Sequence, residues 1–107
     1  MEFKTYPYIE VSTGFLPRSD HDLLLEPSSP HHMATHDEFY GAFFYTLHDV
    51  EPGTVEEFRK RALDFGLSDQ FVEIMIEASR QKIQLVRFDA DGDMIEGLEL
   101  IEKEENI

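Results

Sequence analysis

The sequence contains no cysteine, few basic residues and no long apolar run. Without cysteine the chain has no disulfide, no thiolate zinc site and no cysteine nucleophile, which fits a reducing cytosol. The longest apolar runs are about four residues, whereas a membrane-spanning helix needs about 20. The first residues, Met-Glu-Phe-Lys-Thr, lack the basic and apolar regions of a signal peptide. We therefore expect a soluble protein of the cytoplasm.

Common catalytic motifs are also missing, namely G-x-S-x-G, GxGxxG and the P-loop. Ser12 or Thr13 could place a hydroxyl near a turn, with His21 or His48 as a base. Hydroxyl residues at the end of a strand are more typical of caps and turns, however. We therefore expect no enzyme activity, no catalytic residue and no cofactor.

The shortage of basic residues gives the chain a strong negative charge, because nine Lys and Arg face 23 Asp and Glu, for a net charge of -14. Such a field repels nucleic acid and anionic membranes, and it attracts basic protein surfaces and divalent cations. Residues 89–105 hold eight acids and one base, Lys103, so this segment alone carries -7. We expect its acids to bind a partner: Asp89, Asp91, Asp93, Glu96, Glu99, Glu102, Glu104 and Glu105.

Length and apolar content predict one folded domain. The 107 residues are near the usual domain size, and 41% of them are apolar, including nine Phe and four Tyr. We expect residues 1–101 to form the globular domain and residues 102–107 to form a frayed acidic tail.

Residue patterns in the first half predict two strands and a short helix. The expected elements are a strand over 5–13, a helix from Pro17 carrying Leu23, Leu24 and Leu25, a polar loop through His31, His32 and His36, and a strand over 40–47.

In the second half, Thr54 and Glu57 have the spacing of a capping box that starts a helix, and Gly66 is suited to its end. Ser68 or Asp69 caps a second helix. A strand over 83–88 and an Asp91-Gly92 turn predict a hairpin whose return strand is 94–101. The order β-α-β-α-α-β-β predicts a two-layer α+β domain, with helices on one face of a small, mostly antiparallel sheet and the other face partly open.

Spacing also predicts the partners of several basic residues. Glu56–Lys60 and Glu57–Arg61 are i, i+4 pairs on a solvated helix face. Arg87 is expected to pair across strands with Glu96 or Glu99.

Two clusters contain residue types that bind metals. Asp89, Asp91 and Asp93 lack the glycine and glutamate positions of an EF-hand loop, so they form either a looser divalent site or a solvated turn. His31, His32, His36 and Asp37 are zinc or iron ligand types, or else part of a mobile surface loop. His21 or His48 could also approach the three aspartates.

Several short motifs resemble an uncharacterised family of small domains from bacteria, phages and plasmids. In order they are Val11-Ser12-Thr13-Gly14, the leucine-bearing helix, Tyr40-Gly41-Ala42-Phe43-Phe44-Tyr45, 86–92 (VRFDADG) and Glu96-Gly97-Leu98. The resemblance covers about residues 9–101. This chain has Phe15 where the family commonly has histidine, and an extra helix around 56–65. The resemblance implies a mobile-element setting and no established activity.

Together these patterns favour a non-enzymatic acidic protein that inhibits host nucleic-acid-binding defence machinery, of the anti-CRISPR or anti-restriction type. Its partner would be a basic surface of a host protein or nucleoprotein complex in the host cytoplasm, with no direct contact to nucleic acid or membrane. The alternatives are a metal-binding module or metal-dependent hydrolase that uses Asp89, Asp91 and Asp93 with histidine, and a generic acidic interaction domain. A homo-oligomer is compatible with each.

Overall fold

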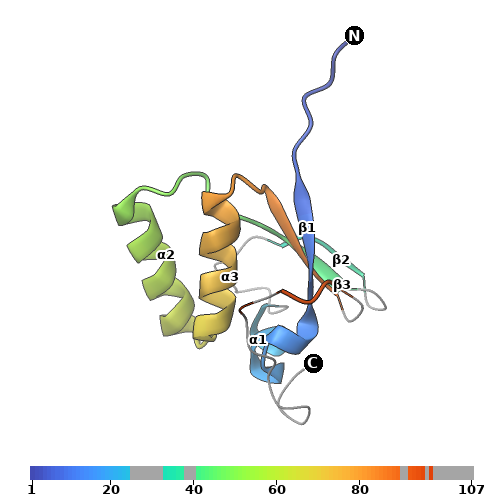
Figure 1. Ribbon diagram of the computed structural model, residues 1–107. Helices are drawn as coiled ribbons and strands as arrows, with labels where there is room; N and C mark the ends of the chain where they lie inside the picture. The colour runs from blue at the N-terminus through green and yellow to red at the C-terminus, as the bar shows by residue number, and fades with distance from the viewer. Residues whose placement is uncertain (25–32, 38–40, 90–91, 96, 98–107) are drawn as a thin grey trace.

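The computed structural model describes residues 1–24, 33–37, 41–89, 92–95 and 97 (Figure 1). Its elements in chain order are β1 (Tyr8–Ser12), the 3-10 helix η1 (Thr13–Phe15), α1 (Arg18–Leu24), β2 (Met33–Asp37), β3 (Gly41–Tyr45), α2 (Pro52–Phe65), α3 (Asp69–Arg80) and β4 (Leu85–Asp89). The predicted α+β class is confirmed.

The four strands form one mixed sheet in the order β1-β4-β3-β2. The first and last strands are parallel neighbours, with Val11 of β1 opposite Phe88 of β4. The other two pairs, β4 with β3 and β3 with β2, are antiparallel. The sheet therefore brings together segments that are nearly 80 residues apart in the chain, in which Arg87 lies opposite Glu10.

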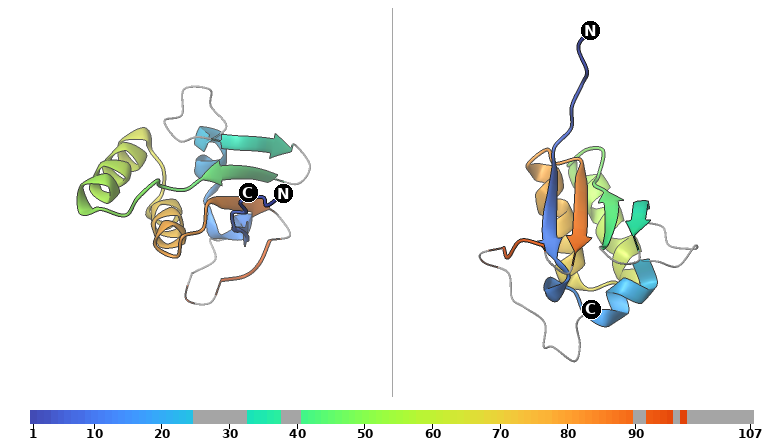
Figure 2. Two further views of the ribbon diagram at one scale, coloured as in Figure 1. Left: turned by 90° about the horizontal axis from the view of Figure 1, so that it is seen from above. Right: turned by 90° about the vertical axis from the view of Figure 1, so that its right-hand side faces the viewer.

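Helices α2 and α3 lie on the same side of the sheet, and the right view of Figure 2 shows the strands in front of them. Three phenylalanines form the centre of the core between the sheet and α3: Phe44 of β3, Phe71 of α3 and Phe88 of β4. Their ring centroids are 5.9 to 6.4 Å apart, and each side chain is at most 3% exposed. This packing fixes one face of the sheet, and no helix of the described residues packs on the opposite face.

The polar loop predicted through His36 is wrong, because Met33–Asp37 is strand β2. It pairs antiparallel with β3, where His36 lies opposite Ala42 and Asp37 opposite Gly41. A polar sequence is compatible with a strand at the edge of a sheet, since main-chain hydrogen bonds to a neighbour stabilise it. His31 and His32 lie outside the described residues.

The hairpin predicted at Asp91-Gly92 is also wrong, because both edges of β4 are already occupied by β1 and β3. Beyond β4 the chain instead crosses β1, where Asp93 forms a parallel bridge with Val11 and its carbonyl accepts the Ser12 N–H at 3.1 Å. A Cβ added at Gly92 would lie 2.5 Å from the Val11 carbonyl carbon, so glycine permits this close crossing. Met94, Ile95 and Gly97 are not in a strand, and the remainder of 94–101 and the tail 102–107 lie outside the described residues.

The capping box predicted at Thr54 is wrong, because α2 begins earlier, at Pro52, with Glu51 at the cap position. The first helical position suits proline, which has no N–H to leave unpaired. Asp49 accepts the Glu51 N–H at 3.0 Å instead. A hydrogen bond from the Thr54 hydroxyl, together with this one, lowers the pKa of Asp49.

The other helix ends agree with the sequence pattern. Gly66 ends α2 in the left-handed conformation, with φ of 105°, and its N–H bonds to carbonyls of the last turn. Ser68 caps α3, where its hydroxyl oxygen accepts the Phe71 N–H at 3.2 Å. Ser12 also acts as a cap, of η1, where its hydroxyl oxygen accepts the Gly14 N–H at 3.1 Å.

Candidate interaction surfaces

Two of the eight acids predicted to bind a partner lie within the described residues. They are Asp89, the last residue of β4, and Asp93, which follows the crossing at Gly92. The other six lie outside the described residues: Asp91, Glu96, Glu99, Glu102, Glu104 and Glu105.

Asp89 is buried and paired, so it does not belong to an exposed acidic surface. It is 7% exposed, and its carboxylate lies 3.0 Å from the Arg87 guanidinium. Arg87 also lies 3.3 Å from Glu10 of β1. The sequence offered a signal for the contact with Asp89, because Arg87 and Asp89 are two apart in a strand and share a face. The contact with Glu10 depends on the pairing of β1 with β4. The predicted partners of Arg87, Glu96 and Glu99, lie outside the described residues.

Asp93 differs from Asp89 in both burial and pairing. Its main chain is fixed by the bridge to Val11, and the residue is exposed. Within the part of the chain that the structure describes, no basic group lies within 4.0 Å of its carboxylate. The start of the acidic segment thus holds one carboxylate that is neutralised inside the fold and one that faces solvent.

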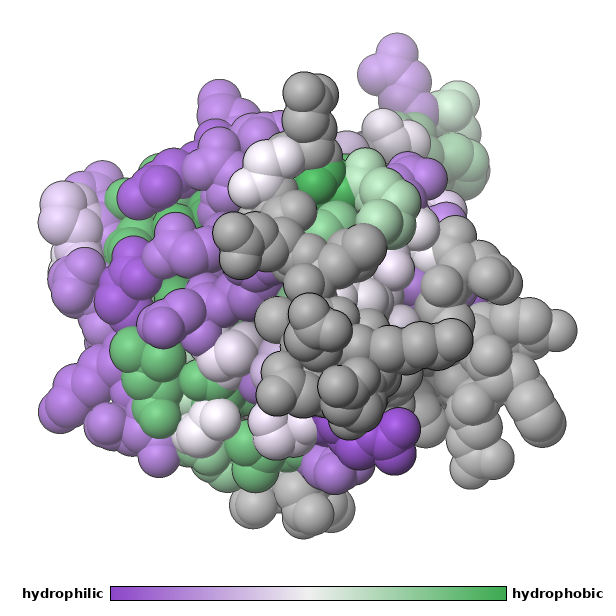
Figure 3. All heavy atoms as spheres, turned by 60° about the horizontal axis from the view of Figure 1, so that its bottom comes forward, coloured by the Kyte–Doolittle hydropathy of each residue, from purple (hydrophilic) through white to green (hydrophobic). Residues whose placement is uncertain are grey.

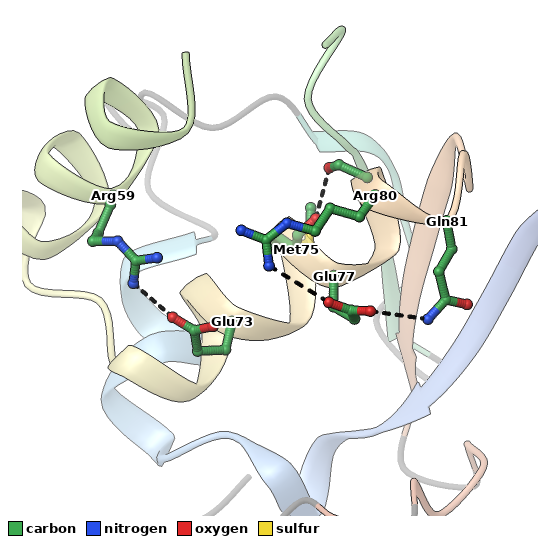
Figure 4. Close-up of polar contacts among 7 residues, drawn as sticks. Arg59, Glu73, Met75, Glu77, Arg80 and Gln81 are labelled. Carbon is green, nitrogen blue, oxygen red and sulfur yellow. Dashed lines mark hydrogen bonds and ion pairs between the residues drawn. The ribbon is translucent and has the colours of Figure 1, made fainter. Parts of the chain in front are cut away.

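The charges on the helices are largely paired with one another (Figure 4). Arg59 of α2 donates to Glu73 of α3 at 2.6 Å, and this contact raises the pKa of Arg59. The predicted Glu57–Arg61 pair is present at 3.9 Å. Glu56, predicted to pair with Lys60, lies instead 3.8 Å from Arg59. On α3, Arg80 lies 3.7 Å from Glu77.

Figure 3 shows hydrophilic side chains over much of the helix side of the molecule, with apolar areas between them. The pairs on this side are exposed, so solvent screens them and each contributes little to stability. An arginine beside each of these glutamates also reduces the negative field that the helices present.

The face of the sheet opposite the helices carries an aromatic row. The strand register places Tyr8 and Tyr45 on either side of Leu85, on three adjacent strands. Tyr8 is 53% exposed and Tyr45 is 50% exposed, and Leu85 is partly exposed. The sequence predicted an open face, but identifying this row requires the register, which depends on pairing between segments distant in the chain.

A buried carboxylate links α1 to the start of α3. Asp20 of α1 is 0% exposed, and it accepts the Ser68 N–H at 2.8 Å and a short hydrogen bond from the Ser68 hydroxyl. Burial raises the pKa of Asp20, although both hydrogen bonds from Ser68 act in the opposite direction. The sequence indicated Asp20 only as a residue of a short helix, because its partner lies 48 positions away.

No metal site is formed by the residues that the structure describes, since no three of their His, Asp or Glu side chains come together as ligands. Asp89 is held beside a guanidinium, which opposes cation binding at that carboxylate. Of the histidine cluster, His36 and Asp37 belong to strand β2, and His31 and His32 lie outside the described residues. His48 pairs with Asp49 at 2.9 Å, and Asp91 lies outside the described residues.

The fold and these surfaces define a small α+β domain. Residues 8–103 match the model of the C-terminal domain of DUF5983, described as a family of unknown function, and the chain belongs to this family. No curated protein and no solved structure matched the chain. Among the helices within the described ranges, none is long and apolar enough to cross a bilayer.

The structure gives a role to Phe15, where the motif resemblance leads us to expect histidine. Phe15 is 1% exposed and belongs to the hydrophobic core. Phenylalanine at this position adds apolar contact and has no polar group that would require a buried partner.

Proposed function

We propose that this domain is a non-enzymatic acidic protein that binds a basic surface of another protein. The observation that carries the proposal is the unequal neutralisation of its acids. Arginines lie beside four exposed glutamates of α2 and α3, whereas residues 89–105 contain eight acids and one base. A segment with such an excess of acids over bases attracts basic surfaces at long range and speeds association with them.

The basic surfaces best suited to such a segment are those that normally hold nucleic-acid phosphates. A protein that occupies such a groove with carboxylates excludes the nucleic acid. We propose a restriction enzyme or CRISPR effector of the host as the target, in the host cytoplasm. The motif resemblance to domains of phages and plasmids supports this setting.

The burial of Asp89 narrows the acids that would contact the partner. Its carboxylate has a structural role beside Arg87, so the binding set becomes Asp91, Asp93, Glu96, Glu99, Glu102, Glu104 and Glu105.

A competition experiment tests the proposal. Purified domain is titrated against a restriction endonuclease and a CRISPR effector, each bound to fluorescent target DNA at low salt, and anisotropy is recorded. We expect the domain to displace the DNA, and added salt should weaken the displacement. The triple change Glu96→Lys, Glu99→Lys and Glu102→Lys should weaken competition about tenfold, if each lost pair contributes about 0.5 kcal/mol.

The matched control changes the net charge by the same amount on the helices, through Glu56→Lys, Asp64→Lys and Glu77→Lys. All three are exposed residues of α2 or α3. This control should compete almost as well as the unaltered protein. Equal losses in both triple variants would show that charge acts only through its total, and failure of the unaltered domain to displace DNA would refute inhibition of these targets.

A further inference from the structure

The open face of the sheet has a row of two tyrosines in register across three strands, and Arg87, paired with two acids, lies next to it. Tyr8, Leu85 and Tyr45 occupy facing positions on β1, β4 and β3. In the right view of Figure 2, these strands lie in front of α2 and α3, so the helices do not cover this face. Two half-exposed tyrosine rings separated by a leucine provide a flat apolar surface with two π faces.

The charges next to this row are more negative than positive. Arg87 is two residues after Leu85 in β4. It lies between the Glu10 carboxylate at 3.3 Å and the Asp89 carboxylate at 3.0 Å. The group of three therefore carries a net charge of -1, in a chain whose total is -14. Glu10 is the more exposed acid, since its side chain is 38% accessible and that of Asp89 is 10% accessible. This electrostatic setting favours a cation beside the tyrosines and disfavours phosphate.

The chain itself contains an exposed tyrosine that accepts a cation, next to the start of β1. The Lys4 ammonium lies 5.5 Å from the centroid of the Tyr6 ring, within the range of a cation–π contact. Tyr6 is 54% exposed and lies two residues before Tyr8, just outside strand β1.

We propose that the open face, through Tyr8, Tyr45 and Glu10, binds lysine or arginine side chains of a basic protein segment. This inference rests on the proposed function and adds a second contact surface to it. Carboxylates of the acidic segment attract the partner at long range, and the tyrosines hold individual cationic side chains at short range. A second copy of this chain is a poor occupant, because two molecules of charge -14 repel each other.

The test uses hexa-arginine as the probe and hexa-citrulline as its uncharged counterpart, titrated into the full ¹⁵N-labelled chain at low salt. We expect hexa-arginine to shift the amide signals of β1, β3 and β4 around Tyr8, Tyr45 and Leu85, and hexa-citrulline to leave them unchanged. The change Tyr8→Thr with Tyr45→Thr should weaken hexa-arginine binding about fivefold or more, at about two- to fivefold for each ring. Threonine suits a strand, so the fold should persist.

Two controls accompany this variant. Tyr8→Phe with Tyr45→Phe keeps both rings and should bind within about twofold of the unaltered chain. Leu63→Ser removes an apolar side chain that is 41% exposed on α2 and should leave binding unchanged. If the double threonine variant is not folded by circular dichroism, the amide shifts and the phenylalanine variant decide the question.

The outcomes separate this inference from the proposed function. Unchanged affinity of the threonine variant, or shifts that avoid the open face, would refute the tyrosine site and leave the acidic segment as the contact. Equal binding of hexa-citrulline would refute the requirement for a cation. Absence of hexa-arginine binding by any form would refute the proposed function as well. A dimer by light scattering that becomes monomeric in the threonine variant would assign the face to a second copy instead.

Discussion

The two faces of the sheet are built from the same strands but have opposite chemistry. Towards the helices, Val11, Val86 and Phe88 are at most 3% exposed and belong to the core. Towards solvent, the alternate positions hold an arginine between two acids and a row with two exposed tyrosines. Alternation with period two therefore encodes two surfaces at once, because successive side chains of a strand belong to opposite faces.

The difference between the two faces indicates where the protein tolerates substitutions without losing stability. Residues of the covered face stabilise the fold through contacts with α3, so their loss should lower the free energy of unfolding. The exposed residues of the open face, such as Tyr8 and Tyr45, contribute little packing, so their loss should affect binding more than stability.

The largest expected effect is the loss of a core ring on the covered face. Phe88→Ala removes a side chain that contacts both Phe44 and Phe71 and should lower the free energy of unfolding by about 3–5 kcal/mol. Urea denaturation followed by circular dichroism measures the change. Tyr45→Ala on the open face of the neighbouring strand β3 should cost about 1 kcal/mol or less, and equal losses would contradict the comparison.

An intermediate effect is expected at the ion pair between Arg87 and the buried Asp89 carboxylate, on the open face of the sheet. Arg87→Met removes the cation 3.0 Å from the buried Asp89 carboxylate and should lower the free energy of unfolding by about 1–3 kcal/mol. Glu10→Gln, at the more exposed end of the same group, should cost less than about 1 kcal/mol. Thermal and urea unfolding of both variants measure the two losses in the free energy of unfolding. A larger loss for Glu10→Gln would contradict the expectation that the buried contact with Asp89 contributes more to stability than the contact with Glu10.

The smallest expected effect is a change in the pH dependence of stability when Asp20 of α1 is replaced. The pKa of Asp20 is raised in the folded state, so the folded chain binds this proton more tightly than the unfolded chain does. Its contribution to stability is therefore present below the unfolded pKa, near 3.8, and is lost as the pH rises through the folded pKa. Asp20→Asn keeps an acceptor for the Ser68 N–H and removes this titration.

Urea unfolding of both proteins between about pH 3 and pH 7 measures the effect at Asp20, since this range brackets the ordinary pKa of an aspartate. The stability of the unaltered protein relative to Asp20→Asn should fall as the pH rises. A difference that stays constant or grows with pH would contradict the raised pKa. Asp20→Ala serves as the comparison, because it removes the same titration and also leaves the Ser68 N–H without its acceptor. It should therefore be about 1–3 kcal/mol less stable than Asp20→Asn throughout this pH range.

Local features of this fold could be predicted from the sequence. Ser68 and Gly66 mark helix ends through groups within a few residues, so the pattern suffices for them. Strand β2 was not predicted, because its polar sequence is stabilised by pairing with β3 and not by its own composition. The hairpin failed for the same reason, since the Asp91-Gly92 signal contains no information that β1 occupies the edge of β4.

The candidate surfaces also divide into features evident from the sequence and features that depend on long-range pairing. The excess of acids in residues 89–105 is found by counting residues in the sequence. The neutralisation of Asp89 by Arg87 follows from their spacing once the strand is known. The row of Tyr8 and Tyr45 depends on two registers, that of β1 and that of β3 against Leu85 of β4, and could not be foreseen.

The crossing at Gly92 also affects how separate molecules meet in a crowded solution. A sheet edge with unused N–H and C=O groups is a template for strands of other chains, and this is a route to aggregation. Here the Asp93 carbonyl accepts the Ser12 N–H, so the chain's own backbone closes this end of β1 to an incoming strand. The exposed Asp93 carboxylate places a negative charge at the same point, which repels an identical neighbour. The first residues of the acidic segment thereby protect the sheet against edge-to-edge pairing at this end.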